Sequence, residues 1–333
     1  MNILVTGGAG YIGSHTCIAL LKAGHSVIVI DNFNNSDRKM VDMIEKLSEN
    51  KITFYEFDVT DNTKLNLVFK KHRIDGVIHF AGFKAVGESI SKPLEYYYNN
   101  LVSTIVLMQA CQKYSISKLV FSSSATVYGE NEVPFKESMK LLPATNPYGQ
   151  TKVMCERMLI DTFNAINNTG VSILRYFNPI GAHESGLIGE KSNGTPNNIM
   201  PYITQVAKGK ISHLKIFGDD YPTIDGTGVR DYIHVMDLAE GHVAAVEQIS
   251  EGVQIYNLGT GYGTSVLELI QTFEKANEVK VPYRIVDRRP GDIAVAYADV
   301  TKAKNELGWE AKRDLITMCR DAWRFEIKKG ENC

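Results

Sequence analysis

Tyr148 and Lys152, four residues apart, are the pair in this sequence best suited to move a proton. On a helix, this spacing places both side chains on one face. A free tyrosine has a pKa of about 10, which is too high for a good base at neutral pH. A nearby ammonium would stabilise the phenolate and lower that pKa. The pair therefore predicts a tyrosine that takes a proton from a substrate hydroxyl.

A second pair with the same spacing, Tyr114 and Lys118, shows why context is needed. It runs from a predicted helix end into a strand, where four-residue spacing no longer places two side chains on one face. Tyr148 instead begins a predicted helix, and Ser122–Ser124 lies upstream at the end of a strand. Ligands of open α/β sheets gather at the carboxyl ends of strands. The context therefore favours Tyr148 and Lys152 as the catalytic pair.

A glycine-rich turn near the N-terminus predicts a dinucleotide cofactor. Gly7, Gly10 and Gly13 lie between a predicted strand and a predicted helix. Glycine lets backbone N–H groups approach a pyrophosphate, and the helix N-terminus stabilises that anion. Asp31 ends the next strand, 18 residues after Gly13, where an acid can bind the adenine ribose. Because a carboxylate there would repel the extra phosphate of NADP, we expect NAD, whose cationic ring would help to lower the tyrosine pKa.

Alternating strands and helices predict the fold that positions these groups. Strands are expected at Ile3–Thr6, Val27–Asp31, Thr53–Phe57, Gly76–Phe80, Lys118–Ser122 and Val171–Phe177. Helices are expected at Tyr11–Ala23, Arg38–Glu49, Asn62–Lys71, Pro93–Tyr114 and Tyr148–Asn167. Several strands are apolar on consecutive residues, as is typical of strands covered on both faces. The pattern predicts an α/β fold with a doubly wound parallel sheet of the Rossmann type.

The pattern loosens after Asn178, which predicts a smaller mixed α/β C-terminal substrate domain. Gly181–Asn198 is rich in Gly, Asn and Pro and is expected to be a long loop. A helix near Met200–Lys208 and short strands follow, and then a helix at Val235–Gln248 and a strand at Val253–Leu258. We therefore expect a cofactor domain over residues 1–177, with a return of the chain near 230–260, and a substrate domain mainly over 178–333.

Composition limits the class of protein. A formal charge of −2 gives no support to a nucleic-acid or polybasic membrane surface. The five cysteines form no C-x-x-C pair, and the eight histidines show no metal-binding spacing, so neither a disulfide framework nor a metal is expected. No stretch approaches the roughly 18 apolar residues of a membrane helix. These features predict a cytoplasmic protein.

These residues together resemble the extended short-chain dehydrogenase/reductase family, in particular its members that act on UDP-hexoses. The resemblance covers nearly the whole chain. The matching segments include Val5–His15, His79–Ser89, Phe121–Gly129, Arg175–Ala182, Pro196–Tyr202 and Ile216–Leu238. Matches of this length are more specific than short motifs.

The resemblance implies roles for individual residues. Tyr148 would be the general base and acid, Lys152 would bind the nicotinamide ribose, and Ser124 would hydrogen-bond the reacting sugar hydroxyl. Besides Tyr148 and Lys152, the residues expected at the cofactor are Gly7, Gly10, Tyr11, Ile12, Gly13, Asp31, Asn32, Asn35, Ser36, Asp58, Val59, Phe80, Ala81, Gly82, Lys84, Asn99, Ser122 and Phe177. Besides Ser124 and Tyr148, those expected at the UDP-sugar are Asn178, Asn198, Ile199, Phe217, Arg230, Arg289, Asp292 and Ala296.

Residue chemistry supports only part of the expected substrate site. Arg230 and Arg289 have the fork geometry that suits a diphosphate, although without the resemblance the residues favour a solvated surface charge for each. Phe217 could stack on uracil or belong to the core. Asn178 could simply cap a turn.

The resemblance also implies an activity. The expected reaction is NAD-dependent inversion of C4 in UDP-hexoses, which interconverts UDP-glucose and UDP-galactose through a transient 4-keto sugar. Each cycle would regenerate NAD, so the cofactor is expected to stay tightly bound. The expected partners are UDP-sugars and a second copy of the chain, joined through the helices near Pro93–Tyr114 and Tyr148–Asn167, with no nucleic acid and no membrane.

Neighbouring activities are the nearest alternatives. Nucleotide-sugar 4,6-dehydratases place an acidic pair after the threonine of the strand-end motif, whereas Val127 and Tyr128 follow Thr126 here. A UDP-glucuronate epimerase or decarboxylase remains open, although the match around Arg230–Leu238 favours a neutral hexose. A non-catalytic NAD sensor is the alternative from another class, and the presence of all three predicted catalytic groups counts against it.

Ala296 bears on substrate choice. Aligned through Gly291-Asp292, it takes a position near the hexose that is a bulky tyrosine in stricter members of the family and a small residue in more permissive ones. A small side chain leaves room for an N-acetyl group, which predicts that UDP-N-acetylglucosamine and UDP-N-acetylgalactosamine are also interconverted. The alternative is that Ala296 is an ordinary strand residue and other loops set the size of the pocket.

Overall fold

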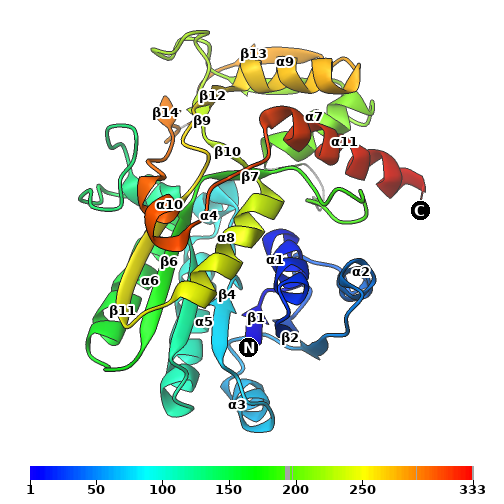
Figure 1. The fold of residues 1–333 in the computed structure, drawn as a ribbon. Helices are drawn as coiled ribbons and strands as arrows, with labels where there is room; N and C mark the ends of the chain where they lie inside the picture. Colours follow the sequence, from blue (N-terminus) through cyan, green and yellow to red (C-terminus); the bar gives the residue numbers. More distant parts are fainter. Residues whose placement is uncertain (192–195, 197, 290, 332–333) are drawn as a thin grey trace.

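A seven-stranded parallel sheet forms the centre of the computed structural model, which describes residues 1–191, 196, 198–289 and 291–331 (Figure 1). The strand order is β11-β6-β5-β4-β1-β2-β3, and every pairing between neighbours is parallel. The strands are β1 (Asn2–Thr6), β2 (Ser26–Asp31), β3 (Thr53–Glu56), β4 (Gly76–His79), β5 (Lys118–Ser124), β6 (Gly170–Tyr176) and β11 (Gly252–Leu258). This confirms the predicted doubly wound sheet.

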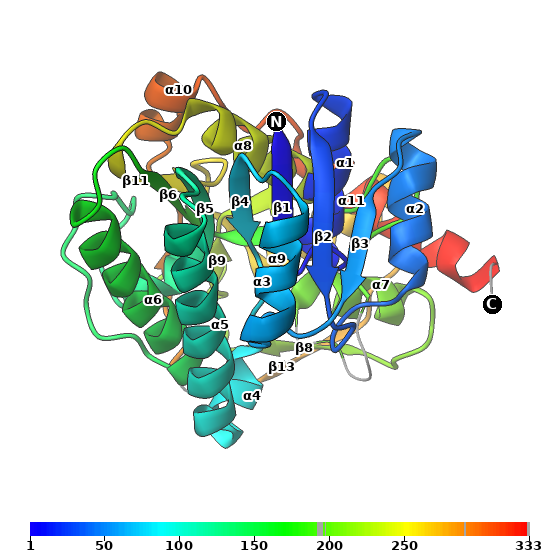
Figure 2. The same cartoon turned by 90° about the horizontal axis from the view of Figure 1, so that it is seen from below.

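Helices cover both faces of the sheet (Figures 1 and 2). One layer comprises α1 (Tyr11–Lys22), α2 (Lys39–Ser48) and α8 (Val235–Gln248), and the other comprises α3 (Asn62–Lys71), α5 (Pro93–Lys113) and α6 (Pro147–Asn164). Along β1, Ile3 and Val5 pack into the first layer, whereas Leu4 packs into the second. Because side chains alternate across a strand, a strand covered on both faces must be apolar throughout.

The predicted elements of the first half are present with small shifts at their ends. The helix expected from Tyr148 begins one residue earlier, at Pro147, where proline is pre-organised for the first helical position. Asn146 caps this helix, because its side chain accepts a hydrogen bond from the Gly149 N–H at 2.9 Å. The cap fixes the start of the helix that carries Tyr148 and Lys152.

The remainder of the chain forms small sheets and helices around a core of its own. β7 (Asn178–Ile180) pairs with β10 (Tyr232–His234), β8 (Leu214–Phe217) pairs with β13 (Tyr283–Val286), and β9 (Val229–Arg230) lies between β12 (Thr264–Ser265) and β14 (Val295–Ala296). The helices that follow β7, besides α8, are α7 (Ile199–Ala207), α9 (Val266–Asn277), α10 (Thr301–Leu307) and α11 (Leu315–Glu331). Two short helices, α4 (Val86–Ser91) and η1 (Ala125–Tyr128), belong to the first half of the chain. β11 then joins the edge of the main sheet beside β6.

The predicted long loop over Gly181–Asn198 is only partly correct. Ala182 and Gly189 form an antiparallel bridge, so the first part of this segment is a short hairpin. Residues 192–195 and 197 of the same segment lie outside the described residues. The composition suggested a loop because a single bridge between two residues leaves no periodic pattern in the sequence.

Four cysteines, Cys17, Cys111, Cys155 and Cys319, are free and buried, as expected of small core residues, while Cys333 lies outside the described part. Among the described residues, none of the helices combines the length and the apolar character needed to cross a membrane.

Candidate active site

Ser124, Tyr148 and Lys152 converge at the carboxyl end of β5. Ser124 is the last residue of β5, and its hydroxyl lies close enough to that of Tyr148 on α6 to lower the pKa of that tyrosine. The Lys152 Nζ donates a hydrogen bond of 2.7 Å to the Ser122 carbonyl and lies 5.9 Å from the centre of the Tyr148 ring. Each of the three predicted catalytic residues is less than one-tenth exposed. The site therefore places a serine, a tyrosine and a lysine together, away from bulk water.

Burial controls the ionisation of these groups. It raises the pKa of Tyr148 to about 12, although the hydrogen bond with Ser124 opposes the rise. Burial also lowers the pKa of Lys152 to about 8. The lowered tyrosine pKa expected from the sequence is therefore wrong for the protein chain by itself. The ammonium of Lys152 is held by a backbone carbonyl, so desolvation of the phenolate outweighs its attraction.

A buried ion pair that the sequence did not reveal orients α6. Glu156 lies four residues after Lys152, and Arg175 on β6 donates to its carboxylate at 2.6 Å. The Ser123 hydroxyl of β5 donates to the same carboxylate at 2.5 Å. Both charged side chains are nearly inaccessible to solvent, so a broken pair would leave an unpaired buried charge. The four-residue spacing from Lys152 was the only signal available in the sequence.

Asn100 on α5 connects the loop after β4 with α6. Its side-chain oxygen accepts a hydrogen bond from Phe83 N–H at 2.7 Å. Its amide nitrogen donates to the Phe83 carbonyl at 3.1 Å and to the Thr151 hydroxyl at 2.9 Å. The residue predicted from the sequence is the neighbouring Asn99, whose amide donates to the side-chain oxygen of Asn100 at 3.1 Å. Asn100 thus fixes the loop that carries Lys84 relative to the helix of Tyr148.

The glycine turn has the shape that a dinucleotide requires. A Cβ on Gly13 would lie 2.3 Å from the Gly7 carbonyl oxygen, and one on Gly7 would lie 2.8 Å from the Ala81 nitrogen. Gly7 also has a φ of +71°, a conformation that favours glycine. The turn is therefore closed to larger side chains and opens directly into α1 at Tyr11, so its backbone N–H groups and the helix N-terminus fit a pyrophosphate.

Asp31 and its neighbours form the part of the site expected to hold the adenosine. The Asp31 carboxylate accepts hydrogen bonds from Ala9 N–H at 3.0 Å, Phe33 N–H at 2.9 Å and the Ser36 hydroxyl at 2.8 Å. It therefore ties the loop after β2 to the glycine turn. The loops after β2 and β3 also meet, because Asn32 donates to Asp58 at 2.8 Å. In these loops Val59 is buried and Asn35 is exposed.

The other residues expected at the cofactor lie around the ends of β4, β5 and β6. Phe80 donates from its backbone to the Thr6 carbonyl at 3.0 Å, which places the segment 80–84 beside the glycine turn. Ser122 is hydrogen-bonded to the Tyr176 hydroxyl, and Phe177 is buried directly after β6. Tyr11 donates to the Gly181 carbonyl at 2.8 Å, so the helix after the turn also contacts the second part of the chain.

Two arginines, an acid and an aromatic ring meet on the substrate side. Asp292 accepts from Arg289 at 2.8 Å and lies 3.6 Å from Arg230. The guanidinium of Arg289 lies 4.7 Å from the centre of the Phe217 ring. The Arg230 side chain is only 19% exposed, so it is not the solvated surface charge that was the alternative. Paired cations beside an aromatic ring suit a nucleoside diphosphate.

The arginine group also includes Ala296 and a carboxylate that the sequence analysis missed. Ala296 is paired with Arg230 in the small sheet and is 7% exposed. Asp231 is fully buried and accepts hydrogen bonds from Thr260 and from the backbone N–H of Gly261 and Ala298. This carboxylate fixes the strand of Arg230, but a single acid next to an arginine gives no distinguishing signal in a sequence.

The remaining expected substrate residues lie on β7 and at the start of α7. Asn178 begins β7 and donates from its backbone to the Asp231 carbonyl at 3.0 Å. Ile199 begins α7, and the Asn198 side chain before it donates to Glu190 at 2.5 Å. Glu190 also accepts from Lys84 at 2.8 Å. The expected substrate residues thus form two groups. Asn178 contacts Asp231 in the group around Arg230. Asn198 is connected through Glu190 to Lys84, which is expected at the cofactor.

A family model described as GDP-mannose 4,6 dehydratase matches residues 4–322. The UDP-glucose 4-epimerase of Bacillus subtilis (strain 168) is 57% identical over 329 residues, which cover 98% of this chain and 97% of that protein.

Solved structures agree with these relatives. A UDP-glucose-4-epimerase from Stenotrophomonas maltophila, with bound NAD and formylated UDP-arabinopyranose, has a TM-score of 0.98 and 48% identity over the whole of both chains. One from Bifidobacterium longum, in complex with NAD+ and UDP, has a TM-score of 0.97 and 49% identity, again over the whole of both chains. The chain therefore belongs to the extended short-chain dehydrogenase/reductase family and, within it, to the UDP-glucose 4-epimerases.

Proposed function

We propose that this protein is an NAD-dependent enzyme that inverts C4 of UDP-hexoses and thereby interconverts UDP-glucose and UDP-galactose. The observation that carries the proposal is the contact of Ser124, Tyr148 and Lys152 at the end of β5, in a sheet whose first turn fits a dinucleotide. Relatives named for this reaction match the chain over nearly all of its length. Binding alone would not need a serine, a tyrosine and a lysine gathered in one buried site.

The catalytic groups have separate roles in the proposed reaction. Bound NAD supplies a hydride acceptor and, in its oxidised form, a positive charge. Tyr148 takes the proton of the C4 hydroxyl and later returns it, while Ser124 hydrogen-bonds that hydroxyl. Lys152 binds the nicotinamide ribose and favours the phenolate electrostatically. Because burial alone raises the pKa of Tyr148 to about 12, the base depends on added positive charge.

Uneven binding explains how the configuration can invert. Arg230 and Arg289 hold the diphosphate and Phe217 stacks on the uracil ring, so the nucleotide anchors the intermediate. The transient 4-keto hexose is held more loosely and turns over, which presents its opposite face for reduction. Asp292 lies between the two guanidinium groups, where it keeps both in place. The proposed substrate site also includes Asn178, Asn198 and Ile199. The proposed cofactor site includes the residues around Asp31, Asp58, Phe80–Lys84, Asn99, Ser122 and Phe177.

We further propose that the enzyme acts on N-acetylated UDP-hexoses. Ala296 is small and buried, and its strand neighbour is Arg230 of the substrate group. Substituting Ala296→Tyr should suppress conversion of UDP-N-acetylgalactosamine at least tenfold and leave UDP-galactose conversion within about threefold, because only the larger substrate needs that volume. Steady-state rates on both substrates test this prediction. Equal loss of both activities would contradict it.

The remaining assignments concern the whole chain. We propose that residues 1–177, with the return near 230–260, bind the cofactor, that residues 178–333 mainly bind the UDP-sugar, and that the protein acts in the cytoplasm.

We also propose a homodimer through α5 and α6, because Leu94, Tyr98, Ile105 and Met154 on these helices are exposed apolar or aromatic side chains. Sedimentation should show a dimer that Leu94→Asp converts to a monomer, and a monomeric wild-type protein would refute this assignment.

A substrate panel tests the proposed activity. Purified protein should convert UDP-galactose to UDP-glucose without added oxidant or reductant. Conversion of UDP-glucuronate instead would favour the neighbouring acid-sugar activities. Folded protein that carries NAD and converts none of these sugars would support a non-catalytic sensor and refute the enzyme assignment.

A further inference from the structure

The segment of residues 182–191 follows β7 and runs from the substrate side of the molecule to the cofactor site. Its base is a short hairpin, in which Ala182 and Gly189 form an antiparallel bridge. His183 N–H donates to the Ile188 carbonyl at 3.1 Å within the same hairpin. A Cβ on Gly189 would lie 2.6 Å from the Phe325 ring of α11, so the hairpin packs closely against that helix. The position of the two residues that follow is therefore fixed.

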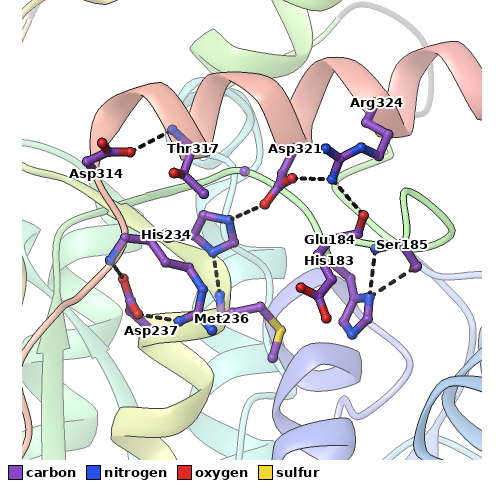
Figure 3. A network of polar contacts seen from close by, with 12 residues as sticks. His183, Glu184, Ser185, His234, Met236, Asp237, Asp314, Thr317, Asp321 and Arg324 are labelled. Atoms are coloured by element: carbon purple, nitrogen blue, oxygen red, sulfur yellow. Dashed lines mark hydrogen bonds and ion pairs between the residues drawn. The ribbon is translucent and has the colours of Figure 1, made fainter.

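Helix α11 holds the turn of this hairpin through a polar network (Figure 3). Arg324 donates to the Glu184 carbonyl at 2.7 Å and to Asp321 at 2.6 Å. Asp321 in turn contacts His234 at 3.3 Å, and His234 caps α8 by accepting from Met236 N–H at 3.0 Å. Figure 3 shows these groups between α11 and α8. The segment is thus anchored at its turn and can present its end to the cofactor loops.

Glu190, at the end of the hairpin, connects the substrate side with the loop after β4. One oxygen of its carboxylate accepts from Lys84 Nζ at 2.8 Å and from the Asn198 amide at 2.5 Å. The Glu190 side chain is only 10% exposed, and its second oxygen is buried with no hydrogen-bond partner among the described residues. A buried carboxylate costs free energy unless it is paired. The contact between Glu190 and Lys84 is therefore favoured over separation of the 182–191 segment from the loop after β4.

Lys191, the next residue, makes a second connection to a different loop. Its Nζ lies 3.2 Å from the Asp37 carboxylate. Asp37 follows Ser36 in the loop after β2, which is expected to hold the adenosine side of the cofactor. Two neighbouring residues of opposite charge therefore join the segment to loops at both sides of the glycine turn.

We propose that Glu190 and Lys191 are positioning residues that retain the dinucleotide, by tying the 182–191 segment to the loops after β4 and β2. The proposal rests on the proposed cofactor roles of those two loops. Both contacts must open before the loops can separate, so they slow the release and the entry of the cofactor alike. Retention serves a reaction that regenerates its cofactor within each turnover. The segment would thus help to hold NAD tightly although Glu190 and Lys191 contact only other parts of the protein and not NAD itself.

The alternative role of Glu190 predicts the opposite result. If this carboxylate acted only by repelling nearby phosphates, its neutralisation would slow the release of NAD. If it ties the loops together, the same change speeds release. Glu190→Gln keeps the shape and the acceptor oxygen but removes the charge, so one variant separates the two roles.

The experiment measures how fast NAD labelled with carbon-14, bound to the purified holoenzyme, exchanges with excess unlabelled NAD. We expect Glu190→Gln to speed exchange about threefold to tenfold, and Lys191→Met about twofold to fivefold, because an exposed ion pair is worth little. Asp37→Asn keeps the hydrogen-bond acceptor for Lys39 N–H, and its NAD exchange rate should match that of Lys191→Met. The double variant Asp37→Asn/Lys191→Met should exchange no faster than either single variant, as expected for one shared contact.

Lys304→Met is the matched control, because it removes an exposed ion pair, with Glu310 at 2.5 Å, on α10. Its exchange rate should equal that of the wild type, and circular dichroism should show that every variant is folded. Unchanged or slower exchange in Glu190→Gln, with NAD retained by the wild type, would overturn this inference alone. Wild-type protein that binds no NAD would overturn the proposed function as well.

Discussion

Tyr148 is the residue on which the chemistry depends, and its surroundings make it a poor base until positive charge is added. Tyr148→Phe removes the hydroxyl that moves the proton, so turnover should fall about 10²- to 10⁴-fold while NAD remains bound. Steady-state kinetics and the NAD content of the purified variant measure the two effects.

Tyr114→Phe is the matched control, because Tyr114 has the same spacing to a lysine but bonds to Asn66 at 3.1 Å. Turnover by the control should be unchanged. A Tyr148→Phe variant as active as the wild type would remove the tyrosine from the mechanism.

At the scale of residues, regular spacing in the sequence points to side chains that belong to a pair, but it gives no sign of a side chain that has no partner nearby in the sequence. Tyr148 and Lys152 could be found because a helix turns four-residue spacing into proximity. Glu190 and Asp231 could not, since a lone acid has the same appearance whether it is exposed or buried. For the protein chain without its cofactor, the direction of the Tyr148 pKa shift also differs from the expectation, because the balance between desolvation and a nearby ammonium depends on where the ammonium is held.

At the scale of elements, the glycine turn makes the sharpest prediction. Gly13→Ala places a Cβ within 2.3 Å of the Gly7 carbonyl oxygen, so the turn must open and NAD binding should fall at least tenfold. NAD content and binding measured by calorimetry test this outcome.

Gly24→Ala is the control at the other end of α1. Gly24 also has a positive φ, of +83°, but its added Cβ would meet no atom within 4 Å. This variant should lose about 1 kcal/mol of stability and keep its NAD. Normal NAD binding by Gly13→Ala would show that the turn does not form the phosphate site.

The long elements were predictable because apolar runs and caps mark them locally. α3 and α8 have the bounds that the sequence predicted, and the strands of the main sheet differ from prediction by at most two residues at an end. Short strands were expected in the second part, but the positions and the pairing of its strands of two to four residues could not be predicted. Strands that short are set by tertiary contacts such as those of Asp231.

At the scale of the whole molecule, buried neutral histidines predict sensitivity to acid. Burial lowers the pKa of His15 and His79 to about 3 and that of His242 to about 4. Between about pH 6.5 and these values the unfolded chain binds protons that the folded chain does not, so stability falls as the pH falls. Urea unfolding should show a loss of about 2 kcal/mol per histidine between pH 7 and pH 5.

His242→Phe tests this assignment, because the ring packs between Phe80 and Tyr176 and its Nε2 is buried with no hydrogen-bond partner among the described residues. The variant should show a shallower loss of stability with acid. Identical pH dependence in His242→Phe and the wild type would contradict the prediction.

The central claim is that C4 is oxidised and reduced within one binding event by a cofactor that stays on the protein. The most direct test converts UDP-galactose that carries deuterium at C4, in ordinary water with no added NAD, and locates the label by NMR. We predict UDP-glucose that retains the deuterium at C4, because the hydride is returned to the same carbon. UDP-glucose without the label at C4, or no conversion by folded protein that carries NAD, would contradict the account.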